Sequence, residues 1–133
     1  MERRESARWR CRFLLSKYRE DIASYRGCEE EFRRLFKPYE VVYGEGNCLL
    51  NGGIDEMWDL ICGDSANHFN NAGAQIGVGD SGTAASPVQT DLQAAGNKTY
   101  KGMDSGYPTS TAQKATFKAS FGATLVCGFA RIM

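Results

Sequence analysis

Residues 44–63 read GEGNCLLNGGIDEMWDLICG and contain the clearest helical pattern in the chain. Apolar residues recur there at steps of three and four: Leu50, Ile54, Met57, Trp58 and Ile61. Carboxylates occupy the other face, and Gly63 provides a left-handed stop. The pattern predicts one main amphipathic helix at about residues 49–62, capped by Asn47 or Asn51, with its apolar face, Trp58 and Cys62 included, in the core.

Two strands and a short helix are predicted before this helix. Apolar residues alternate with mostly basic ones near the start of the chain: Trp9, Cys11, Phe13 and Leu15. A period of two is typical of a strand with one buried face, so we expect a strand at residues 8–18. Helical spacing predicts a short helix at 29–36, stopped by Pro38, and residues 41–43 predict a second strand ended by the flexible segment 44–47.

After the main helix, the composition shifts to Gly, Ala, Ser, Thr and Asn, which suits turns and close strand packing. Ala74, Ile76 and Val78 alternate as a strand. Thr90 or Asp91 is expected to cap a brief helical segment ending near residue 95. Residues 104–108 predict a turn, and the best strand pattern of the chain lies at 115–121.

Together these elements predict an α+β fold rich in β structure, an antiparallel sheet or sandwich with one main helix and long loops of small residues. A length of 133 residues fits a single domain, residues 1–133. Within it we distinguish a charged strand or arm region at 1–46 from a core at 47–133.

Charge and composition exclude several classes of protein. The chain has 16 basic and 16 acidic residues, so no overall positive field attracts nucleic acid or anionic lipid. Neither a signal peptide nor an apolar run long enough to cross a bilayer is visible. Five dispersed cysteines are an odd set, which favours free thiols in a reducing compartment.

Glycines at 77, 79 and 82 match the Gly-x-Gly-x-x-Gly pattern of dinucleotide-binding loops. Such a loop must open a helix, whereas Pro87 and a small-residue run follow here, with no acidic residue about 20 positions on. We therefore interpret the three glycines as a plain turn and expect no cofactor.

The segment 79–82, Gly-Asp-Ser-Gly, is similar to the nucleophile segment of trypsin-like serine proteases. A serine nucleophile needs a histidine base held by an acid, and the one histidine, His68, lies in a polar loop. His68 with Cys48 and Cys62 also lacks the paired spacing of a zinc site. The sequence thus predicts neither catalytic nor metal-binding residues, and a hydrolase using Ser81 or a cysteine is kept as a rival.

Five arginines occupy the first twelve residues: Arg3, Arg4, Arg8, Arg10 and Arg12. They could form a phosphate-binding arm for nucleic acid, which remains a second rival. Because acidic residues are mixed with them and the net charge is zero, a solvated strand face or a partner-protein surface is favoured.

Four segments, at 44–63, 69–98, 100–108 and 115–122, resemble a group of small virion proteins of tailed bacteriophages; together they cover over half of the chain. The order of helix, strand, Val-Gly-Asp, small-residue loop and Gln-Thr-x-Leu is also similar to the N-terminal attachment module of phage tail fibres. The resemblance implies a non-enzymatic structural protein of the virion, assembled in the host cytoplasm and placed at the tail, baseplate or fibre attachment, with capsid decoration as the alternative. It implies other virion proteins and copies of itself as partners, with no small-molecule substrate and no membrane.

The resemblance also implies further strands beyond residue 122, where this chain has a short apolar tail. A sheet that lacks them has an open edge, which favours pairing with another chain. We expect the tail and the strand at 115–121 to be covered by a neighbour. The expected interface residues come from the first strand, the 79–91 loop and the tail: Arg8, Arg10, Arg12, Asp80, Ser81, Thr90, Asp91, Leu125, Val126, Phe129 and Ile132.

Overall fold

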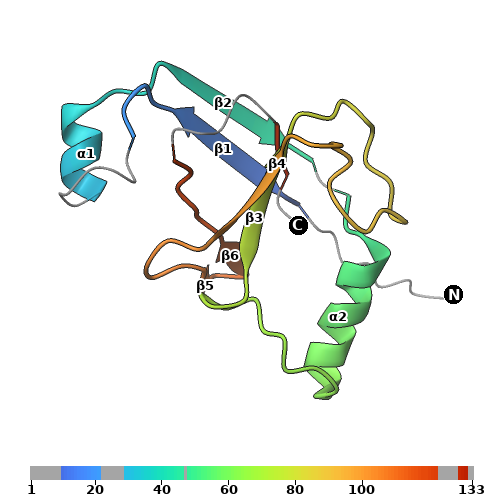
Figure 1. Ribbon diagram of the computed structural model, residues 1–133. Coiled ribbons are helices and arrows are strands. Elements are labelled where there is room, and N and C mark those ends of the chain that lie inside the picture. The colour runs from blue at the N-terminus through green and yellow to red at the C-terminus, as the bar shows by residue number, and fades with distance from the viewer. Residues whose placement is uncertain (1–9, 22–28, 47, 123–128, 132–133) are drawn as a thin grey trace, which may run out of the picture.

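The computed structural model describes residues 10–21, 29–46, 48–122 and 129–131 (Figure 1). It has an α+β fold with three small antiparallel sheets and one main helix, which confirms the predicted fold class. The strand orders are β1-β2, β4-β3-β7 and β5-β6. The short helix α1 and the main helix α2 lie at opposite ends of the molecule in Figure 1.

The first sheet is a two-stranded ribbon of β1 (Arg12–Lys17) and β2 (Glu40–Glu45). Phe13 pairs with Gly44, where an added Cβ would lie 2.2 Å from the Phe13 ring. Because Gly44 has no side chain, the Phe13 ring can lie over it. The structure corrects two predicted boundaries: Arg10, Cys11 and Tyr18 lie outside β1, and β2 extends through Gly44 and Glu45, which were expected to be a flexible end. Residues 8 and 9 of the predicted strand lie outside the described residues.

Helix α1 (Glu29–Leu35) lies where a short helix was predicted and is attached through Phe32. This ring is fully buried, packs edge-on against Tyr18 with 5.2 Å between centroids, and lies 4.9 Å from the Phe36 ring. Tyr18 directly follows β1, so the aromatic cluster connects α1 to the ribbon.

Helix α2 (Asn51–Cys62) confirms the main helix, and Gly63 ends it in the left-handed conformation with φ of 81°. The predicted N-cap is wrong. Leu50 occupies that position and makes no side-chain hydrogen bond to the helix, while the Asn51 N–H donates to the Pro87 carbonyl at 2.8 Å. Asn47 lies outside the described residues.

The predicted burial of α2 is also wrong. None of its residues is buried: Ile54 is exposed, and Trp58 and Ile61 are 61% and 71% exposed. Cys62, expected to behave as a small buried hydrophobe, is an exposed free thiol. The half-buried residues of the helix are Gly53, Glu56, Met57 and Leu60, whereas the side that carries Ile54, Trp58 and Ile61 is exposed, so the amphipathic pattern is not satisfied within the subunit. No helix among the described residues has the length and apolar character needed to cross a membrane.

Trp58→Ala should change the free energy of unfolding by less than about 1 kcal/mol, because truncation of an exposed side chain removes few contacts. The sequence pattern alone predicts a loss of about 3 to 5 kcal/mol for a core tryptophan. Urea unfolding of wild type and variant separates the two values. A loss of stability as large as that expected for a core tryptophan would mean that Trp58 packs against the rest of the subunit.

The three-stranded sheet has β3 (Gln75–Gly79) at its centre, with β4 (Lys98–Gly102) and β7 (Phe129–Arg131) on either side, both antiparallel to it. This confirms the strand predicted from Ala74, Ile76 and Val78. Apart from Phe32, the buried apolar residues of the described chain all lie in this sheet or in the segments beside it: Ala74, Ile76, Val78, Leu92 and Ala94. The main core therefore surrounds β3.

The third sheet is a hairpin of β5 (Thr109–Thr111) and β6 (Lys114–Thr116). Its two-residue turn holds Ala112 and Gln113 at positive φ, the geometry of a tight hairpin. The predicted strand at 115–121 is wrong beyond Thr116. Residues 117–122 are irregular and bind Asp104 in place of a strand partner: the Asp104 N–H donates to the Lys118 carbonyl at 2.9 Å, and its carboxylate accepts from the Ser120 N–H at 3.0 Å and the Ser120 hydroxyl at 2.8 Å.

Candidate functional site

The structure places the expected interface residues on separate elements. Arg10 and Arg12 are exposed at the start of the ribbon, whereas Asp80, Ser81, Thr90 and Asp91 belong to the irregular segment between β3 and β4. Phe129 begins β7, whose backbone pairs with β3 of the same chain, so part of the predicted intermolecular tail is used within the subunit. Outside the described residues lie Arg8, Leu125, Val126 and Ile132.

The ribbon has one strongly exposed face, which we name the outer ribbon face. Its apolar residues are Leu14, Val41 and Tyr43, and its basic end carries Arg10 and Arg12. Leu14 and Tyr43 are directly paired across the strands and are 68% and 60% exposed. An apolar stripe with a cationic end therefore faces solvent.

Contacts among the polar groups order one end of the outer ribbon face. The Arg12 Nε donates to Glu45 Oε1 at 3.0 Å, and the Tyr43 hydroxyl donates to the same oxygen at 2.7 Å. The hydrogen bond to Glu45 raises the pKa of Tyr43, while the same bond, and then the nearby arginines, lower the pKa of Glu45. The Arg12 guanidinium and the Tyr43 ring are thereby held beside each other.

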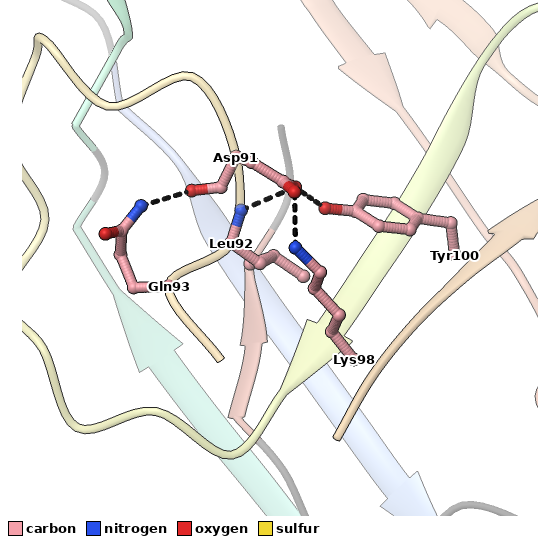
Figure 2. Close-up of polar contacts among 5 residues, drawn as sticks. All are labelled: Asp91, Leu92, Gln93, Lys98 and Tyr100. Atoms are coloured by element: carbon pink, nitrogen blue, oxygen red, sulfur yellow. Dashed lines mark hydrogen bonds and ion pairs between the residues drawn. The ribbon is translucent and has the colours of Figure 1, made fainter. Parts of the chain in front are cut away.

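Figure 2 shows a second group of contacts, centred on Asp91. Its carboxylate accepts hydrogen bonds from the Leu92 N–H at 2.7 Å, from the Lys98 ammonium and from the Tyr100 hydroxyl. Its backbone carbonyl accepts from the Gln93 Nε2 at 2.8 Å. The predicted helical segment at 92–95 is absent from this part of the described chain, because the Asp91 carboxylate fixes the backbone in another conformation.

The Asp91 group fastens a loop over the sheet. Gly77 and Tyr100 are paired across β3 and β4, and an added Cβ on Gly77 would lie 2.7 Å from the Tyr100 ring and 2.9 Å from Leu92 Cδ1. An added Cβ on Gly79 would lie 3.0 Å from Ala94 Cβ. Two glycines thus let the loop descend onto β3, which explains them by packing rather than by nucleotide binding.

The hydrogen bond to Lys98, and then that from the Leu92 N–H, lower the pKa of Asp91. A lowered folded-state pKa means that the charged form stabilises the fold above the unfolded value, about 3.9. This stabilisation is lost as the pH falls from there through the lower folded-state pKa. Asp91 is therefore a structural carboxylate that stays ionised in mild acid.

Asp91→Asn should lower the midpoint of thermal unfolding at pH 6 to 7, because it weakens the bonds to Lys98 and Tyr100. The difference from wild type should shrink as the pH falls below about 4, because the carboxylate of the unfolded chain binds a proton there and the folded one follows at lower pH. Thermal melts between pH 3 and 7 measure it, with the exposed Asp59→Asn as control. A difference that is constant with pH would contradict the assigned role of the charge.

Hydrogen bonds within the loop also occupy Asp80 and Ser81. The Asn97 amide donates to Asp80 Oδ2 at 2.6 Å, and the Ser81 hydroxyl donates to Thr83 Oγ1 at 3.0 Å while accepting from the Thr83 N–H at 3.1 Å. These contacts are typical of turn residues. No group of three potential metal-ligating side chains occurs among the residues the structure describes.

The sequence did not reveal the two exposed apolar faces, on the ribbon and on α2. Periodicity identifies an apolar face correctly but does not say whether the same chain covers it. On the ribbon, Leu14 was the available signal, since it alternates with Phe13 and Leu15, which were expected to be buried. No protein-family model, curated protein or solved structure was found to match the chain.

Proposed function

We propose that this chain is a non-enzymatic structural component of a tailed-phage virion that acts by protein–protein assembly at the tail, baseplate or fibre attachment. Its partners are other virion proteins and further copies of itself. The virion-protein resemblance of residues 44–122 supports the class of particle. The exposed apolar side chains support the mode of action.

One observation carries the proposal: two elements present apolar residues to solvent in the isolated subunit. The outer ribbon face exposes Leu14, Val41 and Tyr43, and α2 exposes Ile54, Trp58 and Ile61. Single exposed apolar residues are ordinary, but aligned groups on one face are typical of surfaces that another protein covers. Assembly into a particle removes both faces from water.

Immunogold labelling of purified, salt-washed particles tests the proposal. An affinity epitope after Met133 marks the chain, and particles without the epitope provide the control. We expect label at one fixed position on the tail. Label over the capsid would instead favour a decoration protein, and label that washes off with salt would contradict a structural role.

Ser81→Ala should leave folding and incorporation into particles unchanged, because the hydroxyl is used in a local turn. Wild type and variant should be equally inactive toward generic ester and peptide substrates. Hydrolysis by the wild type that disappears in a folded variant would overturn the non-enzymatic proposal and support the hydrolase rival.

A further inference from the structure

The two exposed apolar faces differ in charge. We name the exposed side of α2 the α2 apolar face: Ile54, Trp58 and Ile61. All charged residues of α2 are acidic, and at helical spacing Asp55 and Asp59 form a row on one flank of this face. The outer ribbon face is net basic at its end, where Arg10 and Arg12 lie with a single carboxylate, that of Glu45, which is ion-paired with Arg12.

We infer that α2 of one copy docks on the outer ribbon face of a second copy, in a head-to-tail contact. This inference rests on the proposed function and names the partner of these two faces. In it the α2 apolar face covers Leu14, Val41 and Tyr43, while the carboxylate row meets the two guanidinium groups. Arg12 is already held beside Tyr43 by Glu45, so the cation is in place before docking.

The dimensions of the two faces agree. The 12 residues of α2 extend about 18 Å, and the six residues of each ribbon strand extend about 20 Å. Residues four apart on a helix are separated by about 6 Å along its axis, and alternate residues of an extended chain by about 7 Å. Asp55 and Asp59 therefore match the spacing of Arg10 and Arg12.

Charge decides against the symmetric alternatives. Pairing α2 with α2 of a second copy would bring only acidic residues together, since the helix contains no Lys or Arg. Pairing two outer ribbon faces with parallel strands would bring the arginine ends together, and pairing them with antiparallel strands would place the arginines against Ser16 and Val41, which offer no opposite charge. The contact between unlike faces brings opposite charges together and leaves one free face on each copy, so it extends into a ring or an open chain.

A contact between one short helix and a two-stranded ribbon is at the low end of specific interfaces, which bury about 1,000 Å² or more. We therefore expect reversible association of the purified chain. Repetition around a particle would strengthen it, because each added copy is held by its neighbours as well.

Two variants, each lacking one face, test the inference. The helix-face variant carries Trp58→Gln and Ile61→Gln, and the ribbon-face variant carries Leu14→Thr and Val41→Thr, replacements that retain helix and strand propensity. Sedimentation equilibrium should show wild type growing beyond a dimer with concentration. Each variant alone should lose self-association by about 100-fold, and an equimolar mixture should form a 1:1 heterodimer that grows no further.

The outcomes are distinct. If the ribbon-face variant still dimerises and the mixture gives no heterodimer, α2 pairs with itself and the inference is wrong. A wild type that stays monomeric at every concentration, or variants that associate like wild type, would also overturn it. Circular dichroism establishes that each variant is folded.

Charge variants provide a second measurement that leaves both apolar faces intact. Asp55→Lys with Asp59→Lys should weaken association, as should Arg10→Asp with Arg12→Asp, and a single chain that carries all four substitutions should self-associate again, because both of its faces then have reversed charge. Failure of this exchange would contradict the assigned pairing. If particles carry the gold label but the purified chain shows no head-to-tail association, this inference alone is wrong. If the purified chain associates but particles carry no label, the proposed function alone is wrong.

Discussion

Gly77→Ala should lower the free energy of unfolding by about 3 kcal/mol, because the added methyl group enters a filled space at the centre of the core. Gly77 is buried in the middle of β3, and its Cβ would be 2.7 Å from the Tyr100 ring and 2.9 Å from Leu92. Neither neighbour moves freely. The Tyr100 hydroxyl is bound to Asp91, and Leu92 is held by the backbone bond to the same carboxylate.

Gly102→Ala is the matched control, since Gly102 lies at the end of β4 in the same sheet and an added Cβ there would meet nothing within 4 Å. Its effect should be below about 1 kcal/mol. Urea denaturation of the three proteins gives both values. Equal stabilities for Gly77→Ala and Gly102→Ala would contradict the packing of the 91–95 loop on β3.

Phe32→Ala should cost about 3 to 5 kcal/mol, the usual range for removal of a buried aromatic ring. Phe32 is 1% exposed and contacts the rings of Tyr18 and Phe36. Truncation removes the centre of the cluster that connects α1 to the ribbon. Far-ultraviolet circular dichroism with urea unfolding measures the loss.

Leu35→Ala on the same helix is the control, because Leu35 is 56% exposed. The two variants change helix propensity in the same direction, so the difference between them reports burial. If both lower the midpoint by similar amounts, α1 contributes through its backbone rather than through the Phe32 cluster, and the described packing is wrong.

Much of the local structure could be predicted from the sequence. The period of 3.6 identified α2, Gly63 identified its end, and the alternation at 74–78 identified β3, because these signals depend on the local backbone. The fold class followed from the order of such elements. Boundaries were less exact, as the inclusion of Gly44 in β2 illustrates, since a cross-strand ring rather than local flexibility decides that position.

Tertiary burial could not be predicted in the same way. An apolar stripe on a helix such as α2 usually packs on the core of the same chain. Here the core surrounds β3, and Trp58 remains exposed. The alternation at 115–121 was interrupted because Asp104, far away in sequence, binds Ser120. Similarly, Asp91 looked like a helix cap but binds two residues of β4 as well.

The candidate interface was predicted only in part. Arg10 and Arg12 are exposed as expected, and the structure adds Tyr43 and Leu14 beside them, which turns a charged strand face into a mixed apolar and basic surface. The loop residues Asp80, Ser81 and Asp91 are engaged in contacts that hold the loop itself. Ribbon and α2 therefore replace the loop as the surfaces on which the assembly proposal rests.

The measurement that tests the proposed role most directly is the copy number of the chain in purified particles. Quantitative mass spectrometry with isotope-labelled peptides of this sequence, after nuclease treatment and washing in high salt, gives copies per particle relative to a known virion protein. We expect a constant, integral copy number that is unaffected by the washes. A chain that is absent from particles, or whose amount falls with each wash, would contradict it.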